Sequence, residues 1–117
     1  MTAEFQMSET KQEWLQRVAD IHGLDAEDIE EIAELCIDDT QENINVLKTV
    51  ERGQDLSDAI RAAHSIKGSS ANIHQNEVCN AAKNIENQLR VENFTDLQEN
   101  ISTLESAFIK FKGFLNS

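Results

Sequence analysis

Apolar residues recur every three or four positions along most of the chain, which is the spacing of one buried face on an α-helix. The sequence contains no proline and only four glycines, so few positions can interrupt a helix. Five segments with this spacing follow one another, and few stretches are rich in residues that favour β-strands. The sequence therefore predicts an all-α protein.

Capping residues and glycines set the limits of the predicted helices. Thr10 and Glu13 can form a capping box before a short helix, which Gly23 would end in a left-handed conformation. Asp25 is expected to cap a second helix of about 27 residues that continues to Gly53. The later helices are expected to start near Ser57, after a possible cap at Asn76, and from a second capping box at Thr95.

Each of the last four predicted helices carries one apolar stripe, and the links between them are short. Short links place consecutive helices antiparallel, and helices with one apolar face bury those faces against one another. We therefore predict an antiparallel up-down-up-down four-helix bundle, with the short N-terminal helix covering one end through Trp14. We expect a single domain over residues 1–117, with residues 1–7 frayed.

The charge and motif content exclude several classes of function. A net charge of −12 argues against nucleic acids and anionic membranes as partners. No apolar run approaches the about 18 residues that span a bilayer, and no secretory signal is recognised, so a cytoplasmic location is expected. Cys36 and Cys79 lie at apolar helical positions and are interpreted as reduced core cysteines.

Motifs for bound nucleotides and metals are missing from the sequence. It has no glycine-rich phosphate loop followed by Lys and Ser or Thr, and no HExxH or Cys-x-x-Cys pair. A metal-carrying bundle would need inward His or Glu at ligand spacing on facing helices, which the pattern does not provide. We therefore predict no nucleotide, metal or cofactor site within the chain.

The third predicted helix differs from the others because it is free of acidic residues. Residues 59–76 contain no Asp or Glu, although 22 of the 117 residues of the chain are acidic. The same window contains Arg61, His64, Lys67 and His74. An acidic protein that keeps one stretch free of anions and supplies it with cations has a surface suited to a bound anion.

Helical geometry gathers the residues of this window around His64. His64 lies about 120° from the centre of the apolar stripe, so its side chain is predicted to be exposed. Gly68 and Ala71 share its face, at i+4 and i+7, and Lys67 lies at i+3. Gly68 costs about 1 kcal/mol relative to Ala inside a helix. Its outward position indicates that another protein approaches closely here.

Two hypotheses follow for this face. Neutral imidazole is a nucleophile at cellular pH, and Lys67 supplies a flexible charge for phosphoryl oxygens, so His64 is predicted to carry a phosphoryl group. The alternative is a non-catalytic helical protein-interaction module that docks a partner on the acid-free face. Replacing His64 with Ala would abolish transfer under the first hypothesis and leave partner binding intact under the second. His22 and His74 have no comparable neighbours and are interpreted as ordinary surface histidines.

The segment from Ala63 to Ile73, AHSIKGSSANI, resembles the AHxLKGSSxxLG signature of histidine-containing phosphotransfer (HPt) domains. The resemblance implies that His64 accepts the phosphoryl group, that Lys67 steadies it and that Gly68 keeps the approach open. It implies that receiver domains are the partners and bring their own aspartate and Mg²⁺, so that this chain needs no cofactor. The chain would accept the phosphoryl group from a hybrid sensor kinase and pass it to a response regulator, as a monomeric carrier rather than a kinase.

The partner surface is expected to extend to both sides of His64. Ser69 matches a position of the family signature, and the next helix is similar to the helix that follows the signature in the family. We expect the residues that meet the partner to be Arg61, Ser69, Ala71, Glu86 and Gln88.

Two positions depart from the family pattern. His74 stands where the family usually has Gly, so Asn72 or Asn76 is expected to adopt the unusual dihedral angles of the turn. Glu86 stands where the family often has an amide. Its carboxylate would either raise the basicity of His64 or repel the phosphoryl group, and the sequence leaves both effects open.

Overall fold

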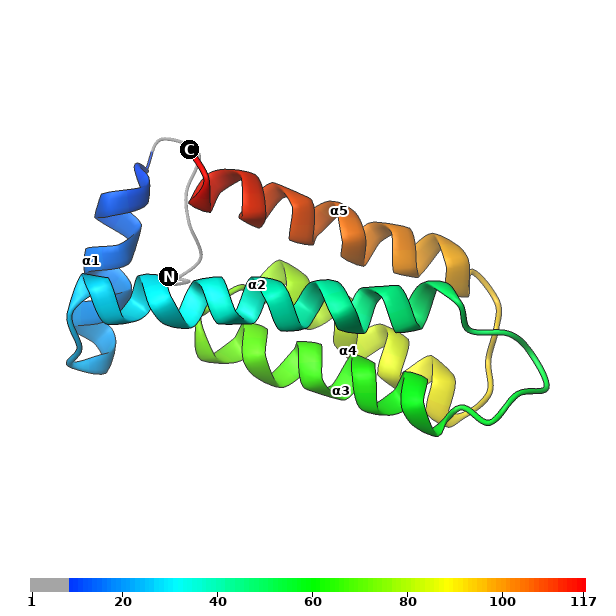
Figure 1. Cartoon of the computed structure of the whole chain (residues 1–117). Helices are drawn as coiled ribbons and strands as arrows, with labels where there is room; N and C mark the ends of the chain where they lie inside the picture. Colours follow the sequence, from blue (N-terminus) through cyan, green and yellow to red (C-terminus); the bar gives the residue numbers. More distant parts are fainter. Residues whose placement is uncertain (1–8) are drawn as a thin grey trace.

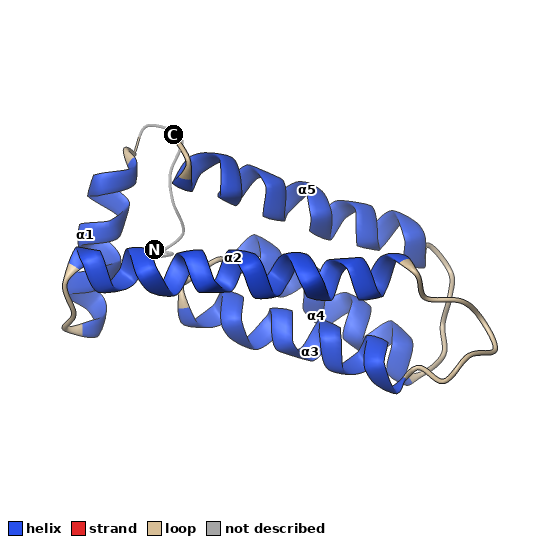
Figure 2. Ribbon diagram, viewed as in Figure 1, coloured by secondary structure: helices blue, strands red, loops and turns tan. Residues whose placement is uncertain are grey.

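The computed structural model describes residues 9–117, and all regular secondary structure in that range is helical (Figure 2). The all-α prediction is therefore confirmed for this part of the chain. The predicted fraying of residues 1–7 lies outside the described residues. The helices are α1 (Lys11–His22), α2 (Ala26–Lys48), α3 (Ser57–Asn72), α4 (Asn76–Arg90) and α5 (Leu97–Leu115).

The long helices α2 to α5 lie beside one another, and each packs against the next along the chain. Helix α2 also contacts α5, so the four helices enclose a common interior. In Figure 1, α2 runs toward the end of the molecule that holds the loop before α3, and α3 returns toward α1. Helix α1 packs across α2 at that opposite end. Because α3 packs against both α2 and α4, its outward face lies between these two helices.

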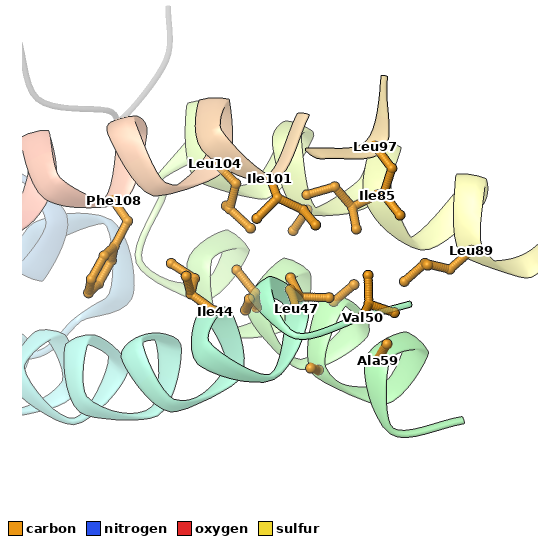
Figure 3. Close-up of a cluster of buried hydrophobic side chains, with 14 of the residues drawn as sticks. Ile44, Leu47, Val50, Ala59, Ile85, Leu89, Leu97, Ile101, Leu104 and Phe108 are labelled. Atoms are coloured by element: carbon orange, nitrogen blue, oxygen red, sulfur yellow. The ribbon is translucent and has the colours of Figure 1, made fainter. Parts of the chain in front are cut away.

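Two clusters of buried side chains hold the helices together. The larger cluster joins all four long helices through residues such as Ile44, Ala59, Ile85 and Leu104 (Figure 3). The smaller cluster contains Trp14, which is fully buried and makes edge-to-face contacts with the two phenylalanines near the end of α5. The apolar stripes predicted from the sequence therefore supply the core, and α1 is fixed through its tryptophan.

Three of the four boundaries of α1 and α2 lie where the sequence predicted them. Thr10 and Glu13 form the predicted capping box, and Gly23 ends α1 with a φ of 69°. Asp25 precedes α2 as expected. The predicted end at Gly53 is wrong, because α2 stops at Lys48. Val50 is still buried after the helix has ended, so its apolar side chain extended the periodic pattern beyond the true boundary.

The starts of α4 and α5 differ from the predicted caps. Asn76 is the first residue of α4 rather than its cap, and Gln75 precedes it. Helix α5 begins at Leu97 after Asp96, which adopts a left-handed φ of 58°. Thr95 belongs to the turn before the helix, where its backbone N–H donates to the side chain of Asn93. Local hydrogen bonding in the turn therefore replaces the predicted capping box.

The turn between α3 and α4 is made by His74 itself, with a left-handed φ of 59°. Asn72 is the last residue of α3 and Asn76 the first of α4, so the prediction that one of them takes the unusual dihedral angles is wrong. The two helices are so close in sequence that only three residues can reverse the chain. Position 74 thus adopts a left-handed conformation although it carries a side chain.

A few residues of the predicted stripes lie outside the core. Ile21 and Ile32 are largely exposed, and both cysteines are free and half-buried rather than deep in the interior. None of the helices in residues 9–117 has the length and hydrophobicity that a membrane span requires.

Candidate functional site

The middle of α3 presents His64 to solvent. On the inner side of the same turns, Ala63 and Ile66 are fully buried and fix the rotation of the helix. The His64 side chain remains 62% exposed, as the helical geometry predicted. Packing of the inner face thus determines that the imidazole points outward.

Helix α4 places the carboxylate of Glu86 against His64. The His64 Nδ1 atom lies 3.2 Å from Glu86 Oε2. Lys67 Nζ lies 2.9 Å from Oε1 of the same carboxylate, and Arg90 Nη2 lies 2.7 Å from Oε2. The Glu86 side chain is only 5% exposed. One buried anion therefore holds together the three positively charged or protonatable side chains around it.

The electrostatic state of Glu86 follows from these contacts. Burial by itself raises the pKa of the carboxyl group, but hydrogen bonds from Lys67, Arg90 and His64 outweigh it and lower the pKa to about 2. Glu86 is therefore ionised at neutral pH. Lys67 and Arg90 balance its charge, which weakens any repulsion of a phosphoryl group near His64.

The ionised carboxylate determines the tautomer of the neutral His64 ring. A carboxylate without a proton can only accept hydrogen bonds, so His64 Nδ1 must carry the proton and donate it to Glu86. The other ring nitrogen, Nε2, then carries the lone pair. When the ring is neutral, this tautomer is a nucleophile at Nε2, and its proton lies on the side of the ring next to Glu86.

The residues next to His64 on the surface of α3 have small side chains. Gly68 is exposed, and a Cβ atom added there would meet no heavy atom within 4 Å among the described residues outside its own helix backbone. Its φ is not positive, so neither backbone conformation nor packing within residues 9–117 requires glycine. Ala71 is also exposed on this face. The two small residues leave open space beside His64, and the close approach of a partner there remains a prediction.

Two of the other predicted partner residues lie at the edges of this face. The Ser69 hydroxyl donates to the backbone carbonyl of Ser65 at 3.0 Å and is half-buried. Arg61 is 76% exposed and forms an ion pair with Asp58, one turn earlier in α3. No hydrogen bond or ion pair joins either residue to His64 within residues 9–117, and the partner contacts predicted for them remain predictions.

Glu86 and Gln88 have different surroundings from those expected of partner residues. Glu86 is buried under His64 instead of forming an outer contact. Gln88 donates to the carbonyl of Thr95 at 2.7 Å and accepts from Asn100 at 2.8 Å, which ties α4 to the start of α5. The structure thus brings Glu86, but not Gln88, together with His64.

Sequence reasoning missed Arg90. It lies four residues after Glu86, so the two side chains share one face of α4, and the i, i+4 spacing was the available signal. That signal is weak because such charge pairs are common on exposed helices. What distinguishes this pair is the burial of Glu86 between α3 and α4, which the sequence does not show.

Two grooves border α3. One, of about 330 Å³, lies between α2 and α3 and is lined by polar residues that include Asp39, Glu42 and Ser65. The other, of about 290 Å³, lies near the end of α3 and is lined by Leu24, Ile32, Asn72 and other residues. Among residues 9–117, no group of three or more His, Cys, Asp or Glu side chains could hold a metal ion.

Comparison with known proteins adds one finding. The family model described as the Hpt domain matches residues 31–112, which is more than half of the chain and includes the whole of α3 and α4. Neither the curated proteins nor the solved structures include a match.

Proposed function

Since the chain belongs to the Hpt domain family, we propose that it is a phosphorelay intermediate that uses His64 as its phosphoacceptor. Members of this family carry phosphoryl groups in two-component signalling and interact with receiver domains. The chain would accept the group from the aspartyl phosphate of a hybrid kinase's receiver and pass it to the receiver of a response regulator. The observation that carries the proposal is an exposed His64 whose Nδ1 atom lies 3.2 Å from the buried carboxylate of Glu86.

The chemistry requires a nucleophile and little else from this chain. The Nε2 lone pair of His64 attacks the phosphorus atom of the aspartyl phosphate, so that an N–P bond forms as the P–O bond to the aspartate breaks. The aspartate leaves with the electron pair as a carboxylate. The imidazole ring becomes positively charged, and its Nδ1 proton faces the Glu86 carboxylate, which stabilises the cation. Attack by the second receiver's aspartate reverses these steps.

Lys67 is proposed to neutralise the phosphoryl oxygens. Its ammonium group already lies beside His64 because both side chains contact Glu86, and its side chain is 32% exposed. A small rotation of a flexible lysine would bring the charge from Glu86 to the phosphoryl group. Arg90 keeps Glu86 paired while Lys67 moves. The Mg²⁺ ion of the reaction is proposed to come with the receiver domain.

The receiver is proposed to dock over the surface formed by the small residues Gly68 and Ala71. Both residues are exposed and small, so the aspartate of the partner can come within bonding distance of the imidazole. The apolar groove at the end of α3, which includes Leu24 and Ile32, extends this surface and offers hydrophobic contact area. Arg61 and Ser69 would contact the partner at the edges.

We propose the antiparallel four-helix bundle as the scaffold for this site, with residues 1–117 as one domain. The contacts that close α2, α3, α4 and α5 into one group support it. As a carrier, the protein would need no nucleotide site of its own. We further propose that it works as a monomer in the cytoplasm, since an exposed histidine needs no second copy to react.

The proposal is tested by incubating the full chain with a receiver domain that has been phosphorylated on its aspartate with labelled phosphate. Label is expected on the chain in an acid-labile, base-stable form, which is the behaviour of phosphohistidine. The His64→Ala variant should take up no label and keep its helical circular dichroism, because the side chain is exposed. The matched control is Thr103→Ala, an exposed polar change in α5, which should leave labelling unchanged.

The outcomes separate the two hypotheses drawn from the sequence. If the His64→Ala variant still accepts label, the phosphoryl group is not carried on that residue. If the wild-type chain binds receiver domains but never becomes labelled, it is an interaction module and the proposed function is wrong.

A further inference from the structure

The polar groove between α2 and α3 has two chemically different walls. Asp39, Glu42 and Asn43 of α2 form one wall, and Ser65 and Ser69 of α3 form the other. Asp39, Glu42 and Ser65 are exposed, so the groove is open to solvent. It therefore offers two carboxylates on one side and neutral hydroxyl groups on the other.

The carboxylates of Asp39 and Glu42 are not neutralised by this chain. Within residues 9–117 neither forms an ion pair, and Arg61, an exposed cation of α3, pairs with Asp58 of its own helix. Helix α2 contains eight acidic residues and one basic residue, so it supplies no nearby cation of its own. Like charges one turn apart on a helix repel each other. The two carboxylates therefore form an anionic site that nothing in the fold requires.

The groove lies close to His64 on the surface of the bundle. Ser65 is the next residue after His64, and helical geometry turns its side chain by about 100° around α3. On a helix of about 10–12 Å diameter, this rotation corresponds to about 10 Å along the surface. An interface that covers about 800 Å² on each partner is about 30 Å across. A receiver domain docked at His64 would therefore also cover the groove.

We propose that this groove binds a lysine or arginine side chain of the receiver domain, and that Asp39 and Glu42 thereby select which receivers the chain serves. The inference rests on the proposed function of His64. A long cationic side chain suits both walls of the groove. Its aliphatic stem can lie along the neutral side chains of Ser65 and Ser69 while its charged group reaches the carboxylates.

The charges of the groove argue against other occupants. The carboxylates of Asp39 and Glu42 would repel a phosphoryl group or another anion, so the groove does not suit a second phosphoryl position. Among residues 9–117, no group of three or more His, Cys, Asp or Glu side chains could hold a metal ion. A receiver with an acidic side chain at the same place would be repelled, which makes the groove a device for discrimination as well as for binding.

The test uses the full chain and a receiver domain that transfers labelled phosphate to it. Calorimetry gives the Kd of the complex, and labelling kinetics give the transfer rate at saturating receiver. Asp39→Asn combined with Glu42→Gln removes both charges and keeps the size of the side chains. The Kd should rise about tenfold, because two exposed ion pairs with the receiver are lost. The transfer rate at saturation should stay within about twofold, since only binding is changed.

The matched control removes the same two kinds of charge elsewhere. Asp96→Asn combined with Glu99→Gln changes two exposed carboxylates at the start of α5, outside the groove, and should leave the Kd within about twofold. A charge reversal, Asp39→Lys with Glu42→Lys, should weaken binding further. Replacing the lysine or arginine of the receiver that fills the groove with Glu should then restore it. Circular dichroism of each variant verifies that it is folded.

The outcomes separate this inference from the proposed function. Weaker binding by the neutralised variant, with label still reaching His64, supports the groove as a receiver contact. An unchanged Kd for that variant, or an equal loss in the α5 control, overturns the inference while transfer to His64 remains established. A wild-type chain that binds receivers and never becomes labelled overturns the proposed function, and the inference with it.

Discussion

Two histidine contacts, one in α3 and one in the turn that follows it, show how the partner of an imidazole determines its chemistry. His64 contacts the carboxylate of Glu86, whereas His74 contacts the imidazole of His22. An ionised carboxylate keeps a proton on the adjacent ring nitrogen and stabilises positive charge on the ring. A second imidazole offers no such charge, and burial together with Arg17 opposes protonation of His74. The surroundings of His64 therefore favour a positively charged ring, whereas those of His74 lower its pKa and disfavour one.

The two regions also differ in backbone conformation, at Gly68 beside His64 and at His74 itself. Gly68 lies in regular helix, where its lack of a side chain is not needed for folding. His74 occupies a left-handed turn, where glycine would be favoured. Gly68 thus leaves open space beside His64, where we propose that a partner approaches, whereas His74 carries a large side chain at a left-handed position.

Among the substitutions that test the difference between the His64 and His74 regions, the largest effect is expected at Gly68. A Gly68→Gln substitution should slow phosphoryl transfer from a receiver by about 100-fold, because the new side chain would stand between the partner and His64. The free energy of unfolding should rise by about 0.5 kcal/mol, since Gln is the better helix former. The measurement combines transfer kinetics with urea unfolding.

A control with Gly113→Gln places the same change in α5, where an added Cβ also meets no neighbouring atom within 4 Å. It should stabilise the chain similarly and leave transfer unchanged. Equal transfer rates for Gly68→Gln and the wild type would show that the small residue beside His64 has no role in phosphoryl transfer.

A smaller effect is expected from the pH dependence of stability at Glu86. The folded-state pKa of about 2 lies below the ordinary value of 4.5, so Glu86 stabilises the fold above pH 4.5. That contribution is lost as the pH falls toward 2. Because its cationic partners are partly exposed, we expect about 1–3 kcal/mol at neutral pH. The Glu86→Gln variant should therefore be less stable than the wild type at pH 7.

Urea unfolding of both proteins between pH 7 and pH 2 measures this contribution. The difference in unfolding free energy should narrow as the pH falls below 4.5, since the wild-type carboxyl group then becomes protonated. Thr103→Ala, an exposed polar change in α5, should give a difference that does not vary with pH. A constant difference for Glu86→Gln would mean that the carboxylate is not held by its three partners.

The smallest effect is expected at His74. A His74→Gly substitution removes left-handed strain of about 1 kcal/mol but also removes the hydrogen bond to His22, worth a similar amount. The unfolding free energy should change by less than about 1 kcal/mol, and phosphoryl transfer should be unaffected. Thermal unfolding and transfer kinetics measure both. A strong loss of transfer would link this turn to the His64 site and remove the distinction between the two regions.

The fold was largely predictable because it depends on periodic burial. The stripe of α5, from Leu97 to Leu115, is buried at every predicted position, and the capping box at Thr10 is present. The wrong predictions concern the ends of helices, where short-range hydrogen bonds in turns compete with helical hydrogen bonds. Thr95 belongs to a turn instead of a cap, and α2 ends before Val50 although that residue is buried.

The candidate site was predictable only in part. His64, Lys67 and Gly68 are close in sequence, so the geometry of one helix placed them on the same outer surface. Glu86 was noted, but its burial and its charge balance with Arg90 depend on the packing of α3 against α4. The contact between His22 and His74 joins distant segments, and no local pattern indicates it.

The central claim is that His64 carries the phosphoryl group on Nε2 while its Nδ1 proton faces Glu86. The most direct test is NMR of the chain with ¹⁵N-labelled histidine, recorded before and after phosphorylation by a receiver domain. Coupling between ³¹P and the Nε2 of His64 is expected, with Nδ1 of the same ring still protonated. Phosphorus on Nδ1 of His64, or on the ring of His22 or His74, would contradict the account.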